Sequence, residues 1–250
     1  MSAPVFAAAQ CVVTAGDIDT NLALHLQFMQ QARQHDAQLL IFPELSLTGY
    51  EPDLAHKLAL SSDSSLFIPL RQLAQEAAMT TVVGFPLRLP EHEKPCIASL
   101  ILHADGSSGI YIKQYLHPGE ELYFTEGHDD KLLSINGVPV AMSICADFCN
   151  VSHPQRAAEE GAQLYATSVL ISENGYSHDS VLLQGHAERH GMAVLMANHG
   201  GPTGEWLSAG KSALWDESGR CVVATAGAGN RLLIVAKGEA GWHGRDVAAL

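Results

Sequence analysis

Three residues whose side chains could act together in catalysis each stand at the end of an apolar stretch of the sequence. Glu44 ends LLIFPE, Lys113 follows GIYI, and Cys145 ends VPVAMSIC. An ionisable side chain at the end of a buried strand is costly to desolvate unless it is paired or functional. Taken singly, the three fit plainer interpretations: a capping carboxylate, a solvated ammonium and a small core thiol. Taken together, they supply a base, an electrophile and a nucleophile.

The stretches that must position these residues alternate between strand and helix patterns. Continuously apolar segments of five to eight residues favour buried strands, and apolar residues at helical spacing favour helices, the first of them capped by Asp19 or Thr20. Asp-Gly and Asn-Gly turns predict two hairpins. We expect strands at 4–13, 37–44, 80–86, 163–169 and 192–197, helices at 19–35, 64–78, 154–160 and 179–190, hairpins at 96–116 and 131–145, and closing strands at 211–226 and 231–238.

The whole chain, residues 1–250, reads as one domain, because neither a repeat nor a linker interrupts this alternation. Helices that alternate with strands and hairpins predict an α/β fold with a mixed sheet, or two sheets packed together, and helices outside. Residues from about 239 to 250 are expected to form a C-terminal tail.

Longer segments around the three residues carry a family resemblance. FPELSLTGY, YIKQYLHPGEELYFTEG and SICADF occur in the order and at the approximate spacing of the nitrilase superfamily of carbon–nitrogen hydrolases, which the chain resembles over nearly its whole length. The later segments ANHGG and SAGKSALWDESGRCVV agree with it. The resemblance implies an αββα sandwich, in which two mixed β-sheets pack face to face with helices outside. It also implies a homodimer or larger homo-oligomer.

The same resemblance assigns roles to residues. It implies that Glu44 is the general base, Lys113 the stabiliser of the transition state, Cys145 the nucleophile and Glu120 a supporting glutamate. The chemistry needs these types, because a thiol with a pKa of about 8.5 is only slightly ionised at neutral pH and requires a base when it attacks. The oxyanion that follows requires fixed donors, and Lys113 and the backbone N–H of Ala146 are the natural pair.

The expected reaction is hydrolysis of a small non-peptide C–N bond through a Cys145 thioester, without a cofactor. An amide or ω-amide is favoured, and N-carbamoyl amines and nitriles are alternatives. The segment after Cys145 lacks the Phe-Pro-Glu of many family members, and PELSLTGYEPDL is similar to the glutaminase domain of glutamine-dependent NAD synthetases. Tyr50 and Glu173 are the candidate substrate-binding residues. In a pocket, Glu173 would favour a substrate with an ammonium group; otherwise it is an exposed loop glutamate.

Two interpretations from other classes stay open. Cys145, Cys149 and His153 would share one face of a helix and could hold a catalytic zinc ion, although this is not a compact zinc-site spacing. The chain could also be a catalytically silent binding protein on the same scaffold. His186 and His190 lack the glutamate of a metalloprotease helix and are expected on a solvated face. His199 is expected in a loop.

The amino-acid composition limits the classes of partner that the protein can bind. A formal net charge of -13 argues against nucleic acid or an anionic membrane as partner. Apolar stretches fall short of the about 20 residues of a membrane span. The first residues read as a strand rather than a signal peptide. Five scattered cysteines fit a reduced, cytoplasmic protein that binds a small molecule.

Overall fold

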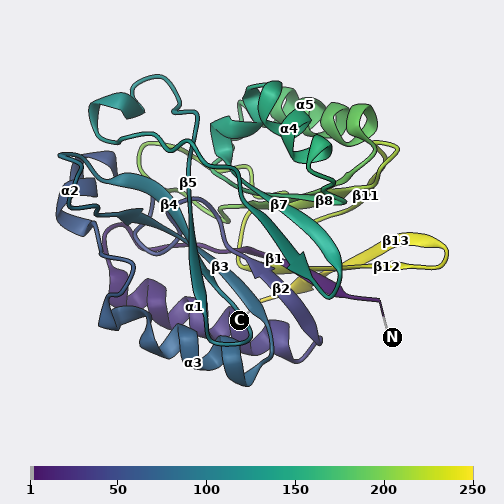
Figure 1. Ribbon diagram of the computed structural model, residues 1–250, viewed down its shortest axis with the longest axis horizontal. Coiled ribbons are helices and arrows are strands. Elements are labelled where there is room, and N and C mark those ends of the chain that lie inside the picture. Colours follow the sequence, from purple (N-terminus) through teal and green to yellow (C-terminus); the bar gives the residue numbers. More distant parts are fainter. Residues whose placement is uncertain (1–2, 250) are drawn as a thin grey trace.

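Two β-sheets lie face to face in the computed structural model, which describes residues 3–249 (Figure 1). The first sheet has the strand order β13-β12-β1-β2-β3-β4-β5 and the second has the order β11-β10-β9-β8-β7-β6. The first contains β1 (Val5–Gln10), β2 (Ala37–Ile41), β3 (Thr80–Leu87), β4 (Cys96–Leu102), β5 (Ser108–Ile112), β12 (Arg231–Gly238) and β13 (Gly241–Ala248). The second contains β6 (Leu132–Ile135), β7 (Val138–Ile144), β8 (Leu164–Val169), β9 (Ala193–Asn198), β10 (Ala213–Trp215) and β11 (Cys221–Ala224).

Both sheets are mixed. The pairs β1–β2 and β2–β3 in the first sheet, and β7–β8 and β8–β9 in the second, are parallel, whereas the other pairs are antiparallel. Two of the antiparallel pairs, β4–β5 and β6–β7, are the predicted hairpins. At the tip of the second hairpin, Asn136 and Gly137 both have positive φ angles, 49° and 84°, as a type I′ turn requires.

Helices cover the outer face of each sheet (Figure 1). Helices α1 (Ile18–Arg33) and α3 (Ile68–Glu76) lie against the first sheet, and α4 (Ser152–Glu159) and α5 (Tyr176–His190) lie against the second. The cap of α1 is Asp17, whose carboxylate accepts a hydrogen bond from the Thr20 N–H, rather than Asp19 or Thr20. The short helices are α2 (Ala55–Leu58), η1 (Pro52–Leu54), η2 (Ser65–Phe67), η3 (Glu120–Leu122) and η4 (Cys145–Cys149).

Three apolar clusters lie between these four layers. The cluster between the sheets contains residues of both, such as Ile41 from β2 and Ile144 from β7. A second cluster joins α1 and α3 to the first sheet, and a third joins α4 and α5 to the second. The predicted αββα arrangement is therefore confirmed. Among the described residues, no helix is long and apolar enough to span a membrane.

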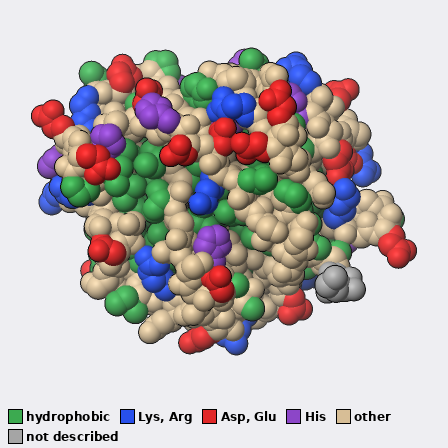
Figure 2. All heavy atoms as spheres, viewed as in Figure 1, with side chains coloured by type: hydrophobic (Ala, Val, Ile, Leu, Met, Phe, Trp, Pro, Cys, Tyr) green, Lys and Arg blue, Asp and Glu red, His purple; other side chains and the backbone are tan. Residues whose placement is uncertain are grey.

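Charged side chains of both signs are interspersed over the face shown in Figure 2. On that face the Lys and Arg side chains stand among acidic ones and form no continuous basic area.

The expectation of a C-terminal tail is wrong for most of the segment, because residues 241–248 form β13 and pair with β12 along its whole length. An apolar side chain fixes this strand: Trp242 is 5% exposed, and its ring centroid lies 5.8 Å from that of Phe6 in β1. Its indole N–H donates to Glu217 Oε1 over 3.0 Å. The strand is thus part of the core between the sheets.

We predict that Trp242→Ala lowers the free energy of unfolding by about 3–5 kcal/mol, because it empties a buried site against Phe6. Trp206→Ala is the matched control, since Trp206 is 46% exposed and should cost less than about 1 kcal/mol. Urea unfolding of the two variants measures the difference. Equal losses would show that β13 does not hold the core.

Candidate active site

The three residues singled out in the sequence lie together where three strands end. Glu44 follows β2, Lys113 follows β5, and Cys145 follows β7 and begins η4. The Lys113 ammonium donates to Glu44 Oε1 over 2.7 Å. The Cys145 thiol donates to the Leu170 carbonyl over 3.8 Å and lies within the electrostatic influence of the Glu44 carboxylate. The two sheets therefore bring a base, a cation and a thiol into one cluster.

Lys113 is fully buried and is held by two carboxylates. Besides Glu44, its ammonium donates to both oxygens of Glu120 over 2.8 Å. Burial by itself lowers the pKa of Lys113, but the charges of Glu44, Cys145 and Glu120 raise it above its ordinary value overall. Lys113 is therefore a permanent cation at neutral pH, and the predicted supporting glutamate is in contact with it.

The two glutamates are held differently. Glu120 Oε1 also accepts from the Tyr50 hydroxyl over 2.8 Å, and its Oε2 accepts from the His117 N–H over 2.7 Å. Glu44 Oε2 is buried and has no hydrogen-bond partner among the described residues. Burial raises the pKa of Glu44 to about 7, although the charge of Lys113 opposes this rise. Glu44 thus combines a free oxygen with a pKa suited to proton transfer.

The thiol of Cys145 is mounted on a constrained turn. Cys145 has a φ of 44°, in the left-handed region that non-glycine residues rarely adopt. Burial and then the charge of Glu44 raise the pKa of its thiol well above the ordinary value. The residue is half-buried and faces a cavity. The thiol is therefore protonated at rest and depends on an adjacent base.

Asp147 fastens this turn to the strand end that carries Lys113. Its Oδ2 accepts from the Ile144 N–H over 2.8 Å, and its Oδ1 accepts from the N–H groups of Gln114 and Tyr115 over 2.9 Å. One buried carboxylate thus ties the residue before the thiol to the residues after the ammonium. The sequence showed Asp147 close to Cys145 but gave no partner for it.

The backbone at Glu44 is fixed from two sides. Gly84 in β3 approaches so closely that a Cβ atom there would lie 2.4 Å from the Pro43 carbonyl oxygen and 2.5 Å from the Leu45 nitrogen. On the other side, the His199 Nε2–H donates to the Glu44 carbonyl over 2.7 Å. His199 follows β9 in a loop, as expected, but it is fully buried, and burial lowers its pKa to about 4.

A cavity of about 460 Å³ opens onto this cluster. Its volume suits a small molecule. The cavity wall includes the predicted residues Glu44, Glu120, Cys145, Tyr50 and Ala146, but not Lys113, which lies behind them. The other lining residues are His117, Phe148, Cys149, Leu170, Ser172, Asn174, Gly175, Asp179 and Trp206.

Comparison with known proteins agrees with this geometry. The family model described as "Carbon-nitrogen hydrolase" matches residues 6–237. The chain belongs to the carbon–nitrogen hydrolase family. Its structure is similar to that of a variant of the amidase from Nesterenkonia sp. AN1, which shows covalent addition of the acetamide moiety of fluoroacetamide at the active-site cysteine. The two chains are 26% identical, with a TM-score of 0.86 over 96% of this chain and 92% of the amidase.

Curated relatives of this carbon–nitrogen hydrolase include two glutamine-dependent NAD(+) synthetases. The one from Thermotoga maritima is 25% identical and the one from Aquifex aeolicus 27% identical, each over 86% of this chain. The chain spans only 38% and 39% of the length of these two relatives.

One of the two predicted substrate-binding residues lies outside the cavity wall. Glu173 is exposed and does not line the cavity; its backbone N–H donates to the Leu207 carbonyl over 3.0 Å. The acidic residue that lines this part of the cavity is Asp179, in the first turn of α5. Tyr50, the other candidate, does line the cavity, and its hydroxyl holds Glu120.

The zinc alternative does not fit the side chains. His153 is buried, and its two ring nitrogens lie 2.8 Å from the hydroxyls of Tyr111 and Tyr165. Neither nitrogen is therefore free for a metal shared with Cys145 and Cys149. Within residues 3–249, no group of three or more His, Cys, Asp and Glu side chains could hold a metal ion.

The prediction for His186 is also wrong. Its ring is 3% exposed, and its Nε2 lies 2.7 Å from the Phe148 carbonyl oxygen. The side chain therefore joins α5 to η4 instead of facing solvent.

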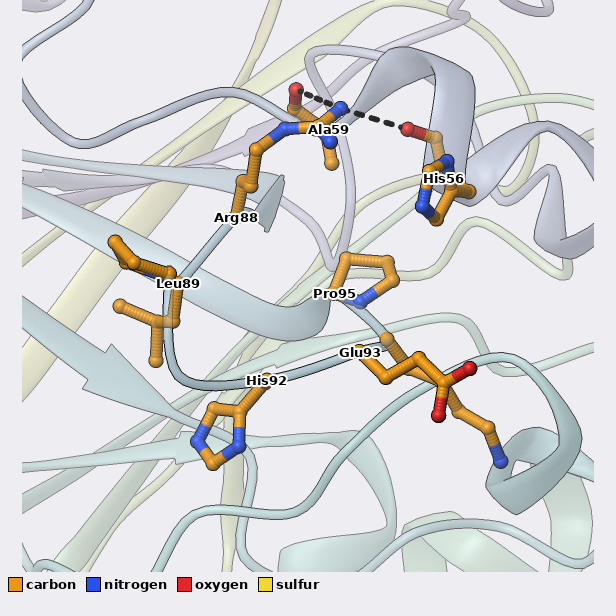
Figure 3. A pocket seen from close by; sticks show the side chains of 9 residues that line it. His56, Ala59, Arg88, Leu89, His92, Glu93 and Pro95 are labelled. Carbon is orange, nitrogen blue, oxygen red and sulfur yellow. Dashed lines mark hydrogen bonds between the residues drawn. The ribbon is translucent and has the colours of Figure 1, made fainter.

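A second, smaller cavity of about 210 Å³ lies beside the segment that follows β3 (Figure 3). Its one arginine, Arg88, donates to the carbonyl oxygens of His56 over 2.8 Å and Ala59 over 3.2 Å. This guanidinium therefore secures the chain around α2. None of Glu44, Lys113, Glu120 and Cys145 lines this cavity, so the family's chemistry points to the larger one.

We predict that Gly84→Ala lowers stability by about 1–3 kcal/mol, because the added methyl group overlaps backbone on both sides of Glu44. It should also slow hydrolysis of a small amide, since the carboxylate shifts relative to the thiol. Urea unfolding and the hydrolysis rate measure the two effects. The control is Gly185→Ala in α5, where a Cβ atom meets nothing within 4 Å and helix propensity predicts a gain of about 0.5–1 kcal/mol. Equal behaviour of the two variants would contradict the close approach of β3 to Glu44.

Proposed function

We propose that this carbon–nitrogen hydrolase cleaves small non-peptide amides through a thioester on Cys145. The observation that carries the proposal is the unpartnered Oε2 of Glu44, buried in the cavity wall beside the thiol and with Lys113 on the opposite oxygen. A base with a free oxygen, a thiol and a fixed cation are what covalent hydrolysis of an amide requires. The amidase from Nesterenkonia sp. AN1, whose active-site cysteine is modified covalently, supports the same chemistry.

The acylation half begins when Glu44 accepts the thiol proton and Cys145 Sγ attacks the amide carbonyl carbon. The resulting oxyanion is stabilised by the Lys113 ammonium and the Ala146 N–H, and one such donor is worth about 2.7–4 kcal/mol. To donate to the oxyanion, the ammonium must share one of the protons that it donates to Glu44 or Glu120. When the C–N bond breaks, Glu44 returns the proton to the leaving nitrogen, and ammonia or an amine departs.

Hydrolysis of the thioester uses the same residues, with water in place of the thiol as the attacking group. Glu44 accepts a proton from water, the hydroxide attacks the thioester carbon, and the C–S bond breaks. The thiolate recovers its proton from Glu44, and a carboxylic acid leaves. Glu120 accepts four hydrogen bonds, two of them from Lys113, and therefore acts by holding the ammonium rather than by moving protons.

Ammonia release from a panel of small amides, with butyramide as the first member, tests the reaction. The cavity volume favours small substrates, and a mutant of the amidase from Nesterenkonia sp. AN1 has been solved in complex with butyramide. The N-carbamoyl and nitrile alternatives belong in the same panel. The homo-oligomer and the cytoplasmic location stay predictions from the resemblance and the composition.

We predict that Cys145→Ala abolishes turnover, because it removes the atom that forms the thioester. The matched control is Cys149→Ala, which should retain most activity. Cys149 lines the same cavity, but Cys145 is the cysteine that interacts electrostatically with both Glu44 and Lys113. Mass spectrometry of the intact protein with a slow amide should show an acyl adduct on Cys145. An adduct that persists in Cys145→Ala, or equal losses in both variants, would refute the assignment.

We predict that kcat/KM rises with pH through a group of pKa about 7, because Glu44 must be ionised to accept the thiol proton. Activity is thus lost as pH falls below that value. Glu44→Gln should reduce the acylation rate by about 10²–10⁴ and remove this limb of the pH profile. Glu120→Gln should keep the limb but move it to lower pH, because the charge of Glu120 raises the pKa of Glu44. A limb near pH 7 that survives Glu44→Gln would show that another group is the base.

A further inference from the structure

Acidic side chains dominate the cavity that opens onto Cys145. Its wall holds three carboxylates, Glu44, Glu120 and Asp179, whereas none of its lining residues is lysine or arginine. The Lys113 ammonium behind the wall is in contact with the first two of these carboxylates. The third carboxylate, Asp179, therefore has no lysine or arginine partner on the cavity wall.

The surroundings of Asp179 do not neutralise it. Its side chain is 24% exposed, and its one ion-pair contact among the described residues is His178, whose Nδ1 lies 3.0 Å from Oδ1. The His178 ring is 75% exposed and belongs to the neighbouring residue in the chain, so that contact is weak. The charge of Asp179 reaches into the cavity, since it adds to burial in raising the pKa of Cys149 to about 11.

Gly175 leaves Asp179 open to the cavity. A Cβ atom at position 175 would lie 3.3 Å from Asp179 Oδ2 and 3.5 Å from Ser172 Oγ, and all three residues line the cavity. The lack of a side chain there keeps Oδ2 uncovered. At the reacting end of the same cavity, the unpartnered Glu44 Oε2 marks where the scissile group is processed. The cavity wall thus holds Asp179 in addition to the carboxylate that takes part in proton transfer.

We propose that Asp179 determines specificity by binding an ammonium group at the end of the substrate remote from the scissile amide. The preferred substrates are then small ω-amino amides. This inference rests on the proposed amide hydrolysis at Cys145. A substrate ammonium supplies the countercharge that the cavity wall lacks, whereas a carboxylate at the same place meets Asp179 without a lysine or arginine to receive it.

Three amides of similar length test the inference: γ-aminobutyramide, the uncharged pentanamide and the anionic glutaramate. For the wild-type protein we expect kcat/KM to be about two- to fivefold higher for γ-aminobutyramide than for pentanamide, the range for one partly exposed charge pair. Glutaramate should be the poorest of the three. In Asp179→Asn, the preference for the ammonium over the uncharged amide should disappear, and glutaramate should improve relative to pentanamide.

The control is Glu173→Gln, which removes one negative charge six residues away on an exposed loop outside the cavity wall. It should keep the wild-type preference, because screening by solvent weakens a charge at that site. Equal kcat/KM for γ-aminobutyramide and pentanamide in the wild type, or a preference that Asp179→Asn retains, would overturn the role of Asp179. Both of these outcomes can be observed only if the protein hydrolyses pentanamide. Failure of all three amides to acylate Cys145 would instead refute the proposed function.

Discussion

The whole site depends on one buried ammonium placed between two carboxylates. Removing Lys113 from water costs several kcal/mol unless its three protons are all accepted, and Glu44 and Glu120 accept them. The contacts are unequal, because Lys113 meets both oxygens of Glu120 but a single oxygen of Glu44. Tyr50 and His117 complete the hydrogen bonds of Glu120, so the position of its carboxylate is fixed. The remaining oxygen of Glu44 is the one available for proton transfer.

Contacts between the two sheets hold this cluster rigid. The ammonium and the thiol come from different sheets, and Asp147 joins their backbones through hydrogen bonds to both strand ends. Gly84 and His199 hold the backbone of Glu44 between them. A displacement of about 1 Å at such a site can cost a hundredfold in rate. The packing of the two sheets is therefore also what sets the geometry of the reacting groups.

Much of this arrangement is readable in the sequence, because apolar runs ending in a polar residue mark buried strand ends. Glu44, Lys113 and Cys145 were found in that way, and the Asn136-Gly137 turn marked a hairpin. Which side chain near the start of a helix faces a cavity is not readable from a pattern along the chain. Helix α5 begins at Tyr176 and not at 179, and of the two acidic residues near its start only Asp179 lines the cavity, whereas Glu173 is exposed outside it. Patterns along the chain also cannot show that Trp242 fills a gap beside Phe6, and so β13 resembled a tail.

The protonation state of Glu44 is the most direct test of this account. Infrared difference spectra recorded during a pH titration resolve the protonated carboxyl band of a buried glutamic acid. The account predicts a band that titrates with an apparent pKa near 7. The band should be absent in Glu44→Gln, and in Glu120→Gln it should titrate at a lower pH. A carboxyl band near pH 7 that remains in Glu44→Gln, or a wild-type protein without such a band, would contradict the claim that Lys113 leaves Glu44 as the proton acceptor.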